Sequence, residues 1–167
     1  MKSTRKLTLY TTRGALIAAL YVIMTLVSSL VGLASGVIQF RISEALCILP
    51  IFFPEAVPGL FVGCLLSNLL AGGVVWDVIF GSIATLIGAY GAYLLRGLPQ
   101  DKIWVATLPT ILSNMIIVPF VLIFAYGAPD SYFFLAITVG IGEIVCAGVL
   151  GSGLYYLLKK TKIKWLK

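Results

Sequence analysis

Long apolar runs alternate with short polar or basic stretches along the whole chain. Five runs can be traced, at about 14–34, 43–73, 77–95, 103–126 and 131–158. A helix needs about 20 predominantly apolar residues to cross the hydrocarbon core of a bilayer, and the five runs approach or exceed that length. The strict alternation of apolar and polar residues that is typical of transmembrane β-barrel strands is absent. The pattern therefore predicts an all-α integral membrane protein.

The second run is interrupted in its middle by three prolines, Pro50, Pro54 and Pro58. Proline removes a backbone hydrogen-bond donor and clashes with the preceding turn, so it kinks or ends a helix. The run could therefore form one kinked helix, or two short helices at 43–53 and 57–72.

The distribution of basic residues favours two short helices. Cytoplasmic loops of membrane proteins carry an excess of Lys and Arg. With six spans and both termini in the cytoplasm, eleven basic residues face inwards and only Arg41 faces outwards. With five spans, eight would face outwards and four inwards. We therefore predict six transmembrane helices, with helices 2 and 3 short and both termini cytoplasmic.

These spans form a single transmembrane domain that covers 1–167. They lie at about 14–34, 43–53, 57–72, 77–95, 103–126 and 131–158. Twelve helical residues extend only about 18 Å, less than the thickness of the bilayer core. Such short pieces are tolerated where they are buried in protein or line a wet cavity, so we expect a cavity near the outer side. The loops on that side are 34–43, 71–76 and 126–131.

Composition supports the membrane assignment and narrows the chemistry. The 167 residues are 60% hydrophobic and 11% charged, whereas soluble domains carry about 25% charged residues. There is no histidine, and the three cysteines lie in apolar runs without paired spacing, so we expect no metal and no cofactor. The chain has no GxxxxGK[ST], GxSxG or HExxH motif. We therefore expect a protein that binds or transports a small molecule, and not an enzyme.

A glutamate and two asparagines lie inside predicted spans, where such groups are costly and by default indicate function. Glu143 is near the middle of the last span, in TVGIGEIVCAG. It could be protonated or paired for structural reasons, or it could contact a ligand or ion. Asn68 and Asn114 could join helices by hydrogen bonds, or their amides could recognise a polar ligand.

Further polar residues lie near the outer ends of the spans. Trp76 could be an interfacial aromatic residue, and Asp77 could interact with the helix dipole. Together they could instead offer a stacking face and a carboxylate to a ligand. Arg41 and Glu44 are three residues apart, so on a helix they could form a local salt bridge, or one of them could face the cavity.

Small residues recur along the first span, as Gly14, Ala15, Ala18 and Ala19. Gly14 with Ala18, and Ala15 with Ala19, form a small-xxx-small pattern that permits close approach of another helix. That helix could belong to this chain or to a partner.

Three linked segments, QFRISEAL, PEAVPGLFVGCLLSNLLAGG and WDVIFGSIATL, resemble the QueT family over roughly residues 8–160. Members are substrate-binding S components of energy-coupling factor (ECF) transporters. The resemblance implies high-affinity binding near the outer face. It also implies uptake driven by one ECF transmembrane subunit and two cytoplasmic ATPases, in a prokaryotic plasma membrane. Ala15 and Ala19, with Gly14 and Ala18 beside them, match the helix 1 face that contacts the transmembrane subunit in many S components.

The resemblance also implies a ligand class, the queuosine precursors, which comprise 7-deazaguanine bases, queuine and queuosine. A guanine-like edge presents two N–H donors, which a carboxylate accepts in bidentate fashion, and a flat face that stacks on an aromatic ring. The residues that we expect to bind this ligand are Gln39, Arg41, Glu44, Asn68, Trp76, Asp77, Asn114 and Glu143. Of the pair in QFRISEA, we expect Glu44 to contact the ligand and Arg41 to organise its neighbours. The expected partners are this small molecule, the ECF subunits and the lipid bilayer, and no nucleic acid.

Two other functions remain open at this stage. A solitary ion-coupled carrier of a small polar or nucleobase-like solute would use Glu143 as its proton or ion site. An intramembrane enzyme would need a carboxylate mechanism, because neither histidine nor a nucleophile motif is present.

Overall fold

The structure is a computed structural model, and it describes residues 2–33 and 39–161. Part of the first predicted outer loop, 34–38, and the tail residues Lys162, Lys164 and Lys167 lie outside the described residues. All regular secondary structure in the described residues is helical. In chain order its segments are α1 (Lys2–Leu30), η1 (Ile42–Ile51), α2 (Ala56–Leu70), α3 (Val75–Leu94), η2 (Gln100–Thr107), α4 (Leu108–Tyr126), α5 (Tyr132–Glu143), η3 (Ile144–Leu150) and α6 (Gly151–Lys160).

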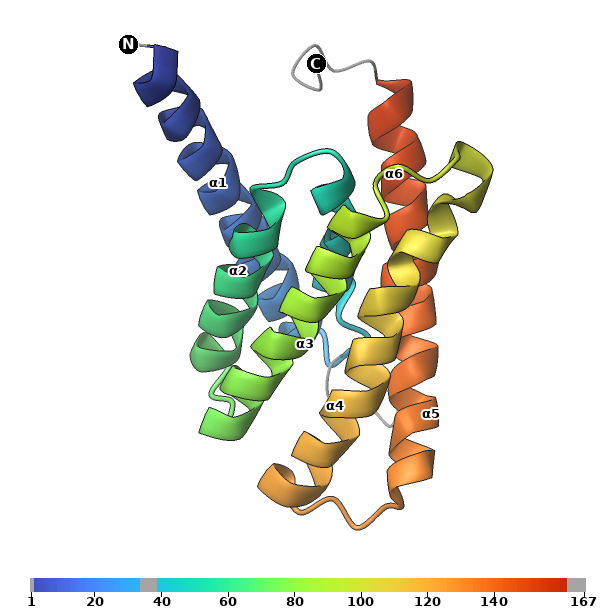
Figure 1. Ribbon diagram of the computed structural model, residues 1–167. Coiled ribbons are helices and arrows are strands. Elements are labelled where there is room, and N and C mark those ends of the chain that lie inside the picture. The colour runs from blue at the N-terminus through green and yellow to red at the C-terminus, as the bar shows by residue number, and fades with distance from the viewer. Residues whose placement is uncertain (1, 34–38, 162–167) are drawn as a thin grey trace.

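The segments form an up-and-down bundle (Figure 1). The N-terminal end of α1 and the C-terminal end of α6 lie at the same end of the bundle. The connections 71–74 and 127–131 lie at the opposite end, which we call the loop end. The predicted all-α architecture is thus confirmed. The assignment of the loop end to the outside rests on the basic residues and stays a prediction.

Four helical stretches in the described parts of the chain are long and apolar enough to cross a membrane. They are Thr4–Leu30, Val75–Leu94, Gln100–Phe124 and Tyr132–Lys160. The apolar helices η1 and α2 are shorter, with 10 and 15 residues, and they occupy the two positions where short helices were predicted. The predicted count of six spans is not settled by these lengths, since η1 and α2 fall below the length of an ordinary span.

The ends of the first helix differ from the prediction. A span at 14–34 was expected, but α1 starts at Lys2 and ends at Leu30. The basic residues before Gly14 are compatible with helix, so the helix continues beyond the apolar stretch that the hydropathy pattern detects. Its C-terminal end is followed by Gly32 in a left-handed conformation (φ 74°), which is a common way for a helix to stop.

The segment η1 lies in the centre of the bundle. It is a 3-10 helix of ten residues with Pro50 inside it, and Ser43 to Pro50 are all buried. Runs of 3-10 helix this long are uncommon. The segment contacts α1, α2, α3, α6 and η3, so the packing on every side, and not intrinsic propensity, accounts for it.

Helices α1 and α2 approach each other closely through small residues. A Cβ atom added to Gly59 would lie 2.6 Å from the carbonyl oxygen of Gly14, and one added to Gly63 would lie 2.9 Å from that of Ala18. Ala15, in contrast, is exposed on the outer surface of α1, and so is Ala19. The small-residue pattern therefore divides into an internal face, Gly14 with Ala18, and an outer face, Ala15 with Ala19.

Candidate functional site

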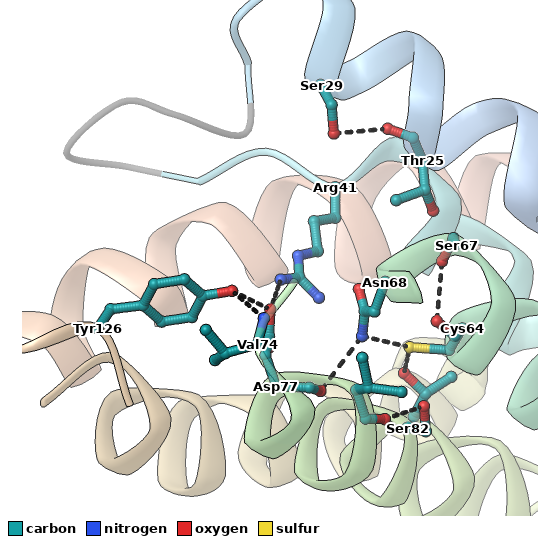
Figure 2. Close-up of polar contacts among 12 residues, drawn as sticks. Thr25, Ser29, Arg41, Cys64, Ser67, Asn68, Val74, Asp77, Ser82 and Tyr126 are labelled. Carbon is teal, nitrogen blue, oxygen red and sulfur yellow. Dashed lines mark hydrogen bonds and ion pairs between the residues drawn. The ribbon is translucent and has the colours of Figure 1, made fainter. Parts of the chain in front are cut away.

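Polar side chains from α2, from α4 and from the segment before η1 surround Asp77 of α3 at the loop end (Figure 2). Asp77 lies in the first turn of α3 and is 8% exposed. The hydroxyl of Tyr126, the last residue of α4, donates to its Oδ2 at 3.0 Å. Asn68 on α2 donates through Nδ2 to the Asp77 carbonyl oxygen at 3.3 Å. Arg41 lies just before η1, and its guanidinium is 3.9 Å from Oδ2, which makes an ion pair without a direct hydrogen bond.

These groups line a cavity of about 200 Å³ at the loop end, which we call the Asp77 cavity. Its lining consists of Thr25, Ser29, Arg41, Asn68, Ala71, Gly72, Gly73, Asp77 and Tyr126. Gly81 borders the carboxylate on its other side. A Cβ atom there would lie 3.3 Å from Oδ1 of Asp77 and 3.0 Å from Nδ2 of Asn68, so the missing side chain leaves space beside both groups.

A second, much smaller hollow lies beside the first. It has a volume of about 10 Å³ and is lined by Gln39, Arg41, Asn114, Val118, Val139 and Glu143, and we call it the Glu143 hollow. Glu143 is 6% exposed, and its Oε2 has no hydrogen-bond partner among the residues that the structure describes. Buried carboxylate oxygens are almost always satisfied, so an unsatisfied one requires an explanation. A polar ligand or an ordered water would supply the missing donor.

The backbone around Glu143 is also irregular. The continuous helix from Tyr132 to Lys160 changes to a π-helix at Ile144–Leu150, directly after Glu143. Segments of π-helix inside α-helices occur frequently at functional sites. The combination of a π-segment with a buried, unsatisfied carboxylate marks this turn as the strongest local candidate for ligand contact.

Arg41 connects the two spaces, because it lines both the Asp77 cavity and the Glu143 hollow. Burial by itself lowers the pKa of Arg41, but the carboxylate of Asp77 raises it above the ordinary value, so the guanidinium stays charged. A third space of about 310 Å³, lined in part by Gln39, Asp130 and Thr138, adjoins the Glu143 hollow through Gln39. Polar groups from widely separated parts of the chain therefore meet at one end of the bundle.

The comparisons with known proteins agree with a membrane transporter. The family model for the QueT transporter matches residues 11–160, which is most of the chain. The chain belongs to the QueT transporter family. The protein named queuosine precursor transporter QueT of Lactococcus lactis subsp. cremoris (strain MG1363) is 37% identical over 92 residues. That match covers 54% of this chain and 53% of the relative, so the alignment spans about half of the relative's length. No solved structure matches.

Membership of the QueT transporter family agrees with the expectation of a multi-pass membrane transporter. Six of the eight expected site residues line the three spaces described above. They are Gln39, Arg41, Asn68, Asp77, Asn114 and Glu143. Thr25, Ser29 and Tyr126 also line the Asp77 cavity but were not expected. Thr25 and Ser29 are four residues apart and so share one helical face, a pattern from which a polar face on this helix could have been predicted. The sequence does not distinguish Tyr126 from an ordinary interfacial aromatic residue.

Glu44 lies elsewhere. It is 1% exposed and lines none of these spaces in the described structure. Its carboxylate accepts hydrogen bonds from the Tyr21 hydroxyl, from the Cys47 thiol at 3.2 Å and from the Thr85 hydroxyl at 3.5 Å. The described ion pairs join Arg41 to Asp77 and not to Glu44. In this QueT family member the glutamate of QFRISEA therefore contacts the core, and the arginine faces the cavity.

Trp76 also lies outside the cavity. Its side chain is 59% exposed and stacks on Phe80, with 5.9 Å between the ring centroids. The two rings line an apolar groove on the outside of α3 and α4, together with Phe120 and Phe124. Adjacent residues on a helix point about 100° apart, so Asp77 faces inwards while Trp76 faces the surroundings.

Replacing Trp76 with alanine is therefore expected to leave ligand affinity within about threefold of the native value, because surface substitutions away from a site have small effects. The measurement is a titration of purified Trp76→Ala with the native ligand. Trp104→Ala is the matched control, since Trp104 is 56% exposed and also lines none of these spaces. A loss of tenfold or more for Trp76→Ala alone would place the ring at the ligand.

Proposed function

We propose that this chain is the membrane subunit that binds a queuosine precursor, a base of the 7-deazaguanine class, for uptake into the cell. The observation that carries the proposal is the buried Oε2 of Glu143, which has no hydrogen-bond partner within the described ranges and lies beside Arg41 and Asn114. Membership of the QueT family and the name of the Lactococcus relative support the substrate class.

The two carboxylates suit different parts of such a ligand. A carboxylate accepts both N–H donors of a guanine-like edge, and in the part of the chain that the structure describes Glu143 has a buried carboxylate oxygen without a hydrogen-bond partner. The amides of Gln39 and Asn114 line the same hollow and can pair with the remaining donors and acceptors. Asp77 lines the cavity on the other side of Arg41, and its carboxylate can pair with a positively charged substituent of the ligand, such as an aminomethyl group.

The charges of the site favour a cationic ligand. Asp77 and Glu143 carry two negative charges when ionised, and Arg41 compensates one of them. A buried charge without compensation is costly, so a ligand with one positive charge would complete the balance. The hollow beside Glu143 is smaller than any purine-like base, so binding also requires the walls to move apart.

We further propose that a partner ATPase module supplies the energy, as in ECF transporters. The sequence contains no phosphate-binding loop of the GxxxxGK[ST] type. The exposed Ala15 and Ala19 offer a surface on α1 that a transmembrane partner helix can approach closely.

A binding screen tests the proposal. Purified protein is titrated with the aminomethyl, cyano and unsubstituted 7-deazaguanines, with queuine, and with guanine and adenine as controls. We expect tight binding of at least one 7-deazaguanine without ATP, with the cationic aminomethyl compound preferred over the neutral cyano compound. Absence of binding to every 7-deazaguanine would refute the substrate class.

Glu143 also favours a second candidate, a solitary ion-coupled carrier, because a buried carboxylate with a free oxygen can hold a proton. Reconstitution into vesicles separates the two functions. Uptake that is driven by a proton or sodium gradient with this chain alone supports the carrier, and uptake only with an ATPase module supports the S component.

A further inference from the structure

One face of α1 carries three polar side chains that contact three consecutive residues of the central segment η1. Tyr21 donates to Glu44, Thr25 donates to the Ser43 hydroxyl at 2.8 Å, and the backbone N–H of Ile42 donates to the Ser28 hydroxyl at 3.3 Å. Residues 21, 25 and 28 share one helical face. We call these three contacts the polar ladder.

The ladder lies in the interior of the protein. Tyr21 is 1% exposed, Thr25 is 5% exposed and Ser28 is fully buried, and Ser43 and Glu44 are buried as well. Polar groups in such surroundings are costly unless they are hydrogen-bonded, so a sliding of η1 along α1 would break several bonds at once. The ladder therefore sets the register of η1 against α1.

Arg41 directly precedes the ladder. Its backbone is extended (φ −97°, ψ 92°), and Ile42 is the first residue of η1. The guanidinium of Arg41 forms an ion pair with Asp77 at 3.9 Å, too long for a direct hydrogen bond. The position of its backbone therefore contributes to where the guanidinium lies, between the Asp77 cavity and the Glu143 hollow.

We infer that Tyr21 and Ser28 are positioning residues for ligand binding, which act through Glu44 and Ile42 to hold Arg41 between the two carboxylates. The inference rests on the proposed function of the site. Thr25 belongs to the same ladder, but it also lines the Asp77 cavity, so its removal would alter the site directly. Tyr21 and Ser28 line none of the three spaces, which makes them the informative positions.

The test is a double-mutant cycle on the affinity for the best 7-deazaguanine. The ladder variant Tyr21→Phe/Ser28→Ala removes two hydroxyl groups and adds no volume. We expect it to weaken binding about tenfold in the native background and less than about twofold in an Arg41→Gln background, because coupled residues are not additive. An equal loss in both backgrounds, or native affinity in the ladder variant, would overturn the inference.

A matched control separates positioning from general stability. Tyr155→Phe/Ser113→Ala removes two hydroxyls from buried residues that line none of the three spaces, and it should leave affinity near the native value. The melting temperature of both double variants is measured alongside. If the control variant weakens binding as much as the ladder variant, the loss comes from general packing and not from the position of Arg41, and the inference is wrong.

A second readout needs no ligand, so it remains decisive if the native protein binds no 7-deazaguanine and the proposed function fails. In Arg41→Cys, the rate of labelling by a small water-soluble maleimide reports the position of residue 41. The three native cysteines are buried. Adding the two ladder substitutions should change the rate at least about fivefold through local opening, and adding the control pair should not. An unchanged rate in the ladder background contradicts the inference.

Discussion

Replacing Glu143 with glutamine is expected to weaken the binding of a 7-deazaguanine by about 100-fold, the largest loss at any single position. Glutamine keeps the shape of the side chain but offers only one acceptor and adds two donors, which would face the N–H groups of the ligand. Truncating one partner of a buried, charged hydrogen-bonded pair costs roughly 2–5 kcal/mol, and each 1.4 kcal/mol corresponds to about tenfold in affinity. The measurement is calorimetric titration of the purified variant.

Glu55→Gln is the matched control for this experiment. Glu55 is as buried as Glu143, with 5% exposure, but it pairs with Arg13 at 3.2 Å beside the start of α2 and lines none of the spaces at the loop end. We expect near-native affinity from it. If Glu143→Gln binds as tightly as the native protein, the ligand does not use this carboxylate.

The double substitution Ala15→Leu/Ala19→Leu is expected to reduce uptake to background while ligand affinity stays near the native value. Both alanines are exposed on α1, so the larger side chains fit without disturbing the bundle. They would prevent the close approach of a partner helix, which depends on small residues at the contact. Uptake is measured in vesicles that contain the energy-coupling module, and affinity is measured on the isolated chain.

Gly14→Leu/Ala18→Leu provides the contrast on the same helix. These residues face α2, where the backbones of Gly14 and Gly59 are already too close for an added Cβ atom. We expect this variant to lose folded protein, binding and uptake together, because overpacking a close helix contact destabilises the fold. Normal uptake by the Ala15/Ala19 variant would show that α1 does not contact the partner through this surface.

Much of the architecture could be predicted from the chain alone. The length of the apolar runs predicted the long helices. The prolines predicted the break between the short helices η1 and α2, although only Pro54 lies at the break, with Pro50 inside η1 and Pro58 inside α2. Six of the eight expected site residues line the spaces at the loop end, and their contact with a ligand stays a prediction. Polar residues in such a chain are few, and each is costly in a bilayer, so their presence carries information.

The rotation of each helix was decided only by the tertiary structure. Asp77 and Trp76 are neighbours in the sequence, yet one lines the cavity and the other faces outwards. The same holds for Ala18, which packs on α2, and the adjacent Ala19, which is exposed. Glu44 pairs with Tyr21, which lies 23 positions earlier in the chain, and not with nearby Arg41.

The physical reason is the nature of the surroundings. In water, the apolar face of a helix identifies its buried side, because only that side is removed from solvent. In a bilayer, lipid and protein interior are both apolar, so the hydropathy of a span specifies its depth and length but not its inward face. Sequence therefore determined that this chain is a helical membrane protein with a few polar residues inside and beside its spans. Packing between helices decided which of those residues face the same cavity.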